Sequence, residues 1–244
     1  GRGWRVPLLV LGMLSLAAGV DAGLLRLGWL LPAPGAATVL DHGPLMICGF
    51  FGTVISLERA VALGAGWAYL APLCAGLGGL ALLAGFGPLP ASALMLAGAG
   101  LLSAATWQLY RRQPALHTLV LLVAAAAWAA GSALEIAGWG VPAVVPLWTA
   151  FLVLTIAGER LELSRFLPPS AVARRAFAII VALLLAGAVA SVADLAAGGS
   201  LFAAALLALA AWLLRQDIAR RTIRERGLTR FVAACLLPGY AWLG

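Results

Sequence analysis

Runs of about 20 apolar residues fill most of the chain, and the basic residues lie in the gaps between the runs. Of the 244 residues, 64% are hydrophobic and 10% are charged, whereas a soluble domain is about one quarter charged. A helix of about 20 apolar residues crosses the roughly 30 Å hydrocarbon core of a bilayer. The pattern therefore predicts an all-α fold, a polytopic bundle of transmembrane helices.

Eight full spans and the start of a ninth can be placed along the chain. Proline and glycine, which favour turns, mark four of the joints: LPAPGAAT, GFGPLPAS, GWGVPAVVP and AAGGS. The predicted spans cover residues 5–28, 38–63, 67–86, 90–110, 114–136, 141–163, 176–196 and 200–214, and the ninth begins near Leu228. We expect one transmembrane domain that covers residues 1–244.

The basic residues predict how the spans are oriented. All 16 are arginines, and every one except Arg26 lies at alternate joints of the series. Because Lys and Arg accumulate in short cytoplasmic loops, the N-terminus is predicted to be cytoplasmic, in a multi-pass protein of the bacterial inner (cytoplasmic) membrane. The formal charge of +7 then faces lipid headgroups, so the lipid bilayer is the predicted partner and nucleic acid is not.

Two similar segments, FFGTVISLERA and FLVLTIAGERLEL, end the second and sixth spans and align Glu58-Arg59 with Glu159-Arg160. They suggest duplication of a four-helix unit, residues 1–112 and 113–226, although similar composition alone would give the same likeness. Neighbours on a helix point about 100° apart. We therefore expect structural charge pairs between helices, Glu58 with Arg160 and Glu159 with Arg59. A cytoplasmic gate or proton route is the alternative.

Acids inside the predicted spans mark a candidate site, because a charge within a bilayer costs about 2.5–3.5 kcal/mol. With the predicted orientation, four acids and His42 lie at a common depth on the outer side. This outer polar cluster contains Asp21, Asp41, Glu135 and Asp194. His117, at the cytoplasmic end of its span beside Arg111 and Arg112, is expected to be an interfacial residue.

His42 and Met46 are separated by four residues and share one helix face. An imidazole with a thioether one turn away suits haem iron or copper. A histidine that is merely hydrogen-bonded at a helix interface is the alternative. No P-loop, HExxH or dinucleotide fingerprint occurs in the sequence, so the motifs do not indicate an enzyme.

The string DHGPLMICGFFGTVISLERAVALG resembles the NnrS family of bacterial membrane proteins. That family has a His-x-His-Glu-Met string followed by Gly-Phe, and His42, Met46 and Gly49-Phe50 match it. The segments TIAGERLELSRFLPP and LLPGYAWLG are similar to the family's Gly-Gly-Arg segment and its Gly-Tyr-Ala-Trp helix.

The resemblance implies an inner-membrane protein of about twelve helices that is associated with haem, copper and the response to nitric oxide. This chain would then supply the first two-thirds of such a protein. The chain departs from the family pattern at Pro44, Leu45 and Glu135, where two histidines and a glutamate are expected. The resemblance therefore assigns a cofactor role to His42 and Met46 alone, with His42 as the metal ligand.

Three functions are compatible with the sequence. The first is an NnrS-like protein that binds haem or copper and acts in nitric oxide handling and nitrosative stress. The second is a transporter or channel for a small solute or protons, with the outer acids lining a vestibule. The third is a structural subunit of a larger membrane complex. The expected protein partners are a second copy of the chain or other membrane subunits.

Overall fold

The computed structural model describes residues 3, 5–29, 40–163 and 170–243, and all regular elements in this part of the chain are helical. The all-α prediction is therefore confirmed. In chain order the elements are α1 (Arg5–Arg26), η3 (Pro44–Phe51), α2 (Gly52–Leu63), η4 (Gly66–Tyr69), α3 (Leu70–Leu83), α4 (Pro88–Arg112), α5 (Leu116–Ile136), α6 (Val141–Leu163), α7 (Ala171–Ala193), α8 (Leu195–Gln216), α9 (Ala219–Thr222) and α10 (Leu228–Leu243).

Eight helical segments of the described residues are long and apolar enough to cross a membrane, with η3 continuing into α2 and η4 into α3. The chain is therefore a multi-pass membrane protein. The span predicted at 141–163 has the bounds of α6, whereas α10, at 16 residues, is shorter than a full span. Some residues of the sequence predictions lie outside the described part of the chain. They are Arg2 and Arg165 of the arginine pattern and positions 38 and 39 at the start of the second predicted span.

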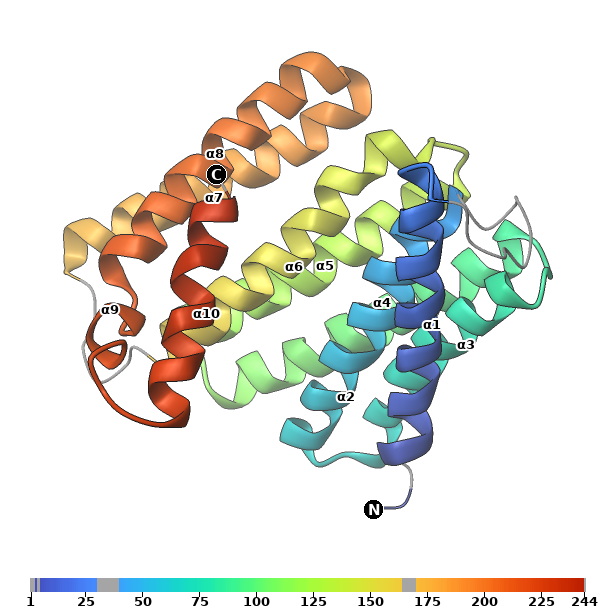
Figure 1. Cartoon of the computed structure of the whole chain (residues 1–244), viewed down its shortest axis with the longest axis horizontal. Coiled ribbons are helices and arrows are strands. Elements are labelled where there is room, and N and C mark those ends of the chain that lie inside the picture. The colour runs from blue at the N-terminus through green and yellow to red at the C-terminus, as the bar shows by residue number, and fades with distance from the viewer. Residues whose placement is uncertain (1–2, 4, 30–39, 164–169, 244) are drawn as a thin grey trace.

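Consecutive long helices lie beside one another and run in alternating directions, notably α3 with α4, α5 with α6, and α7 with α8 (Figure 1). The C-terminal turns of α2, α4, α6 and α8 consequently share one end of the bundle. We call it the arginine end, because it carries Arg59, Arg112, Arg160 and Arg215. The opposite end is called the far end.

Large aromatic side chains fill the centre of the bundle. Trp128 of α5 and Phe151 of α6 are fully buried, and their rings stack with centroids 5.0 Å apart. Trp148 is also fully buried, and it fills the space where a side chain at Gly131 would stand. Glycine thus makes room for tryptophan between closely packed helices, as is usual in membrane bundles.

The hairpin of α7 and α8 turns earlier than the sequence predicted. The AAGGS string was expected to form the joint, but α8 already begins at Leu195. The carboxylate of Asp194 accepts hydrogen bonds from the backbone N–H groups of Ala196 and Ala197, at 2.9 and 3.0 Å. An aspartate in this position is a strong N-cap, so it starts the helix ahead of the glycines.

Gly198 is expected to be essential for the close approach of α7 and α8. A Cβ at Gly198 would stand 2.1 Å from the backbone nitrogen of Ser191, so the helices would have to separate. We expect Gly198→Ala to lower the free energy of unfolding by about 1–3 kcal/mol, measured by thermal unfolding in detergent. Gly199→Ala is the matched control, because nothing lies within 4 Å of its added Cβ. An equal effect of both substitutions would contradict this packing.

Candidate functional site

The interior of the bundle contains a polar seam where the η3–α2 segment faces α5. The ring of Trp128 packs on Gly52 so closely that a Cβ at Gly52 would stand 2.6 Å from the ring atom Cη2. The thiol of Cys48 lies near Trp128 and Ser132 of the same α5 face. Side chains thus reach from the second span to the fifth, although the backbones of the two spans are not closely packed.

The α5 side of the seam presents three polar groups without partners. Trp128, Ser132 and Glu135 follow one another at intervals of four and three residues, so they share one helix face. The atoms Trp128 Nε1, Ser132 Oγ and Glu135 Oε2 are buried and have no hydrogen-bond partner among the described residues. The thiol of Cys48, close to the first two, is only a weak partner. Each unsatisfied group costs about 1–3 kcal/mol in a dry interior.

The η3–α2 side continues the same pattern toward the arginine end. Ser56 and Arg59 lie four and seven residues after Gly52, on the face that meets Trp128. Ser56 Oγ and Arg59 Nε are also buried without a partner. Seven buried side-chain atoms of the described residues lack a partner, and five of them lie in this seam. Unpartnered polar groups are therefore concentrated in one place rather than scattered.

We define the polar seam as Cys48, Ser56, Arg59, Trp128, Ser132 and Glu135. Seven residues separate Glu135 from Trp128, and seven more separate Gly52 from Arg59. At a rise of 1.5 Å per residue the seam extends for about 20 Å. It thus covers most of the roughly 30 Å thickness of a bilayer core.

The second span is irregular where it faces the seam. From Pro44 to Phe51 the chain winds as a π-helix, and the N–H of Gly52 donates to the carbonyl of Ile47, five residues earlier. π-Helical turns are rare and occur frequently at functional sites. Gly49 also lets this segment approach α1, because a Cβ there would stand 2.8 Å from Ser15 Oγ. The π-helical segment therefore lies between α1 and the seam.

Two members of the predicted outer polar cluster meet at the far end of the seam. Asp41 precedes η3, and its carboxylate interacts electrostatically with Glu135 of α5. Burial raises the pKa of Asp41 above its usual range, so this carboxyl holds a proton more readily than an exposed aspartate. Ser92 of α4 lies beside Glu135 as well. The far end of the seam is thus lined by two acids.

The other two acids of that cluster have different surroundings. Asp194 is exposed, and its side chain caps α8 at the tip of the α7–α8 hairpin. Asp21 lies on α1, and in the described part of the chain no ion pair or side-chain hydrogen bond joins it to the other acids. The sequence placed the four acids at one depth, and the structure brings only Asp41 and Glu135 together.

His42 and Met46 make the contacts of helix packing against α1. His42 Nδ1 lies 2.6 Å from the carbonyl oxygen of Gly19. A Cβ at Gly23 would stand 2.9 Å from the imidazole, and one at Gly19 would stand 2.8 Å from Met46 Sδ. Both side chains therefore fill the spaces left by glycines of α1.

The described residues contain no group of three or more His, Cys, Asp or Glu side chains arranged to hold a metal ion. The haem or copper site stays a prediction. It is tested by a Soret band or bound copper in the purified protein that disappears in His42→Ala.

The charge pairs at the arginine end form in part as the sequence predicted. Arg59, only 7% exposed, binds Glu159 of α6 with 2.6 Å between Nη2 and Oε1. The same Nη2 lies 3.2 Å from Oε1 of Glu58, its neighbour in the chain. The predicted pair of Glu58 with Arg160 is not formed, because Arg160 binds Asp217 instead. One of the two predicted links between α2 and α6 is therefore present.

Asp217, just after α8, is the centre of a buried network. Its side chain is completely buried and accepts hydrogen bonds from Arg160 Nε and Nη2, at 2.7 and 2.9 Å. The hydroxyl of Tyr240 and the backbone N–H of Ala219 also donate to it. The network ties α6, α9 and α10 together at the arginine end.

Acid is expected to weaken this network. Burial alone would raise the pKa of Asp217, but the donors Arg160, Tyr240 and Ala219 N–H outweigh burial and hold that pKa below its usual range. A carboxyl with a lowered pKa stabilises the fold fully at neutral pH and loses that contribution as the pH falls through its folded-state pKa. The thermal midpoint of the wild type should therefore fall in acid more steeply than that of Asp217→Asn. Parallel pH profiles would contradict this.

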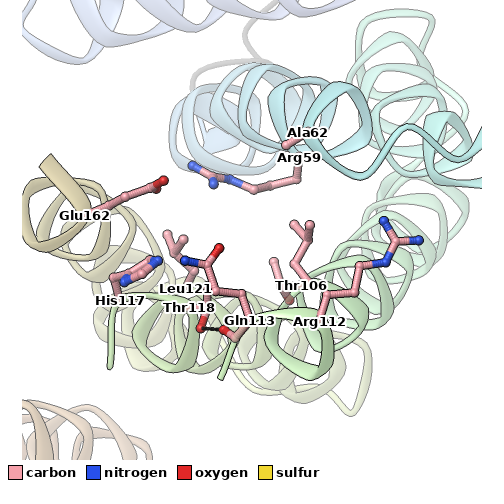
Figure 2. A pocket seen from close by; sticks show the side chains of 10 residues that line it. Arg59, Ala62, Thr106, Arg112, Gln113, His117, Thr118, Leu121 and Glu162 are labelled. Atoms are coloured by element: carbon pink, nitrogen blue, oxygen red, sulfur yellow. Dashed lines mark hydrogen bonds between the residues drawn. The ribbon is translucent and has the colours of Figure 1, made fainter. Parts of the chain in front are cut away.

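A pocket opens beside the seam at the arginine end, between α2, α4, α5 and α6 (Figure 2). Its volume is about 320 Å³. The guanidinium of Arg59 points into it from α2, opposite Gln113 and His117 (Figure 2). Arg112 and Glu162 line it from α4 and α6. His117, expected to be an interfacial residue, is thus a pocket residue.

Sequence reasoning missed most of these residues. Trp128 and Ser132 look like ordinary members of a small-residue helix, and Asp217 looks like one acid in a basic loop. The sequence does contain one signal for the seam. The spacing of Trp128, Ser132 and Glu135 places the three side chains on one helix face. Nothing in the local sequence indicates that Tyr240 reaches Asp217, 23 residues away.

The chain was compared with protein families, curated proteins and solved structures. No curated protein and no solved structure matches it. One family matches nearly the whole chain, over residues 5–244. The chain therefore belongs to the family described as a domain of unknown function, DUF8744.

Proposed function

We propose that this membrane protein conducts protons along the polar seam. The observation that carries the proposal is the row of five buried, unpartnered polar atoms on two facing helix surfaces. In native proteins such groups are normally satisfied, often by ordered water. A file of water between Glu135 at one end and Arg59 with Glu159 at the other would satisfy them. Acids, hydroxyl groups and water in such a file are the usual components of a membrane proton relay.

The tightness of the seam favours protons over a larger solute. Cys48, Trp128 and Ser132 have no exposed surface, and Trp128 fills the space above Gly52. Packing this close leaves no path for an organic molecule, so the proposed cargo is a proton passed between side chains and single waters. The two acids at its far end, Asp41 and Glu135, supply groups that can take up and release protons. We propose that the arginine end faces the cytoplasm and that the membrane is a bacterial inner membrane, because arginines accumulate on the cytoplasmic side.

Proton flux into liposomes tests the proposal. The purified protein is reconstituted with a pH-sensitive dye inside, and a potassium gradient with valinomycin sets an inside-negative potential. We expect the interior to acidify faster than in protein-free liposomes, in proportion to the amount of protein. A pH change no faster than in protein-free liposomes, at neutral and mildly acidic pH and with the potential set in either direction, would contradict proton conduction.

A further inference from the structure

A groove lies between α7 and α8, which form one edge of the bundle (Figure 1). Its volume is about 490 Å³, and it shares no residue with the polar seam. It begins at Ser170 and Arg215, at the arginine end, and reaches Ile180 and Ala208. Only 28% of the residues in the apolar stretch of α7 are buried within the protein. The groove therefore lies on a surface that the bilayer covers.

The inner part of the groove is apolar and narrow. Small side chains from both helices leave the space, those of Ala173, Ala176, Ala208 and Ala211. The indole of Trp212 also lines the groove, and its N–H already donates to the carbonyl oxygen of Ala173 at 2.9 Å. The ten residues from Ser170 to Ile180 span about 15 Å at 1.5 Å per residue. This is about half of the roughly 30 Å hydrocarbon core, so the groove has the length and the surface that suit one acyl chain.

Positive charge is concentrated at the mouth of the groove. The segment 215–230 contains six arginines and two acids, and one of these acids, Asp217, is buried and bound to Arg160. No carboxylate in the described part of the chain forms an ion pair with Arg215. Arg220 Nη1 donates to the backbone carbonyl of Arg215 at 3.3 Å, which brings a second guanidinium to the mouth.

The N-terminus of α7 adds to this charge. Ser170 caps the helix, and its hydroxyl oxygen accepts a hydrogen bond from the N–H of Ala173 at 3.2 Å. The first turn of a 23-residue helix carries partial positive charge and favours an anion. The mouth of the groove is therefore complementary to a negatively charged headgroup.

From this arrangement we propose that the groove binds one molecule of an anionic phospholipid, with its phosphate beside Arg215 and an acyl chain between α7 and α8. Basic pockets between transmembrane helices are typical sites for anionic headgroups. The apolar groove alone would accept any lipid, and the arginines alone would attract any anion. Together they select a lipid that carries negative charge. The inference goes beyond proton conduction and does not depend on it, because no residue of the polar seam lines the groove.

Native mass spectrometry of the purified protein tests the inference. Phosphatidylglycerol is the anionic probe, and phosphatidylcholine with the same acyl chains is the neutral one. We expect one phosphatidylglycerol to stay bound at concentrations at which phosphatidylcholine does not. Arg215→Gln should weaken the affinity for phosphatidylglycerol by about fivefold, the usual contribution of one arginine at an anionic lipid surface. Arg226→Gln is the matched control, because this exposed arginine of the same basic segment does not line the groove.

A second pair of variants tests the apolar part of the groove. Ala208→Trp fills the space between the helices, so it should abolish the preference for phosphatidylglycerol. Ala203→Trp is its control, because Ala203 is exposed, lies about 140° around α8 from Ala208 and does not line the groove. The thermal midpoint of each variant shows that it is folded.

Loss of phosphatidylglycerol binding in Arg215→Gln and Ala208→Trp, but in neither control, supports the inference. Equal binding of the two lipids by the wild type overturns it. Unchanged binding in either Arg215→Gln or Ala208→Trp, or equal losses in the controls, also overturns it. None of these results bears on proton flux.

Discussion

Asp217→Ala is expected to lower the free energy of unfolding by about 3–5 kcal/mol, because it leaves Arg160 as an unpaired charge in a mostly buried site. In the native protein Asp217 accepts hydrogen bonds from two nitrogen atoms of that guanidinium, at 2.7 and 2.9 Å. Tyr240 and the Ala219 amide lose their acceptor in the same variant. Chemical denaturation in detergent, followed by tryptophan fluorescence, measures the change.

Two further variants separate the charge from the hydrogen bonds. Tyr240→Phe removes one donor and should cost only about 0.5–1.5 kcal/mol. The double variant Arg160→Met with Asp217→Leu removes both charges, so it should be less destabilised than Asp217→Ala. A stability of Asp217→Ala within about 0.5 kcal/mol of the wild type would contradict the network. The network would also be contradicted if the double variant were less stable than both Asp217→Ala and Tyr240→Phe.

Glu135→Gln is expected to reduce proton flux in liposomes by at least about tenfold, while the fold stays intact. The substitution keeps the shape of the side chain but removes the group that titrates at the far end of the seam. A relay that loses its proton-accepting carboxyl loses the step that it carried. The dye assay described above measures the rate, and an unchanged thermal midpoint shows that the protein is folded.

Asp194→Asn is the matched control for this prediction. Asp194 is also an acid within the predicted outer cluster, but it is exposed and caps α8 away from the seam. Asparagine is an equally good N-cap, so flux through this variant should equal that of the wild type. Equal flux through wild type and Glu135→Gln would remove Glu135 from the path. An equal loss of flux in both variants would show that charge at the far end matters rather than the seam.

Most of the fold could be predicted from the sequence because its signals are local. Apolar runs of about 20 residues identify spans, and the span predicted at 141–163 has the bounds of α6. The α7–α8 turn was misplaced because Asp194 caps the helix ahead of the Gly-Gly pair. The Gly-Gly pair is evident in the composition, but an N-cap that lies before it is not.

The candidate site was less predictable because burial is decided by distant segments. Glu135 can be identified from the sequence because it is a charged residue inside a span. Only the structure shows that polar atoms of Ser132 and Trp128 are buried without partners. Asp217 lies in a basic stretch that suggests a solvated loop, and α10 buries it by bringing Tyr240 over it. The sequence identifies His42 because imidazole can bind a metal. Its contact with a glycine of α1 is visible only in the structure.

Water in the polar seam is the most direct test of the account. An experimental structure of the protein in lipid, at a resolution that shows ordered solvent, should reveal waters within hydrogen-bond distance of Trp128 Nε1, Ser132 Oγ and Glu135 Oε2. We predict that these waters form a file that continues past Ser56 toward Arg59. A seam in which the same atoms hydrogen-bond to protein groups, with no solvent between the two helices, would contradict a proton path there.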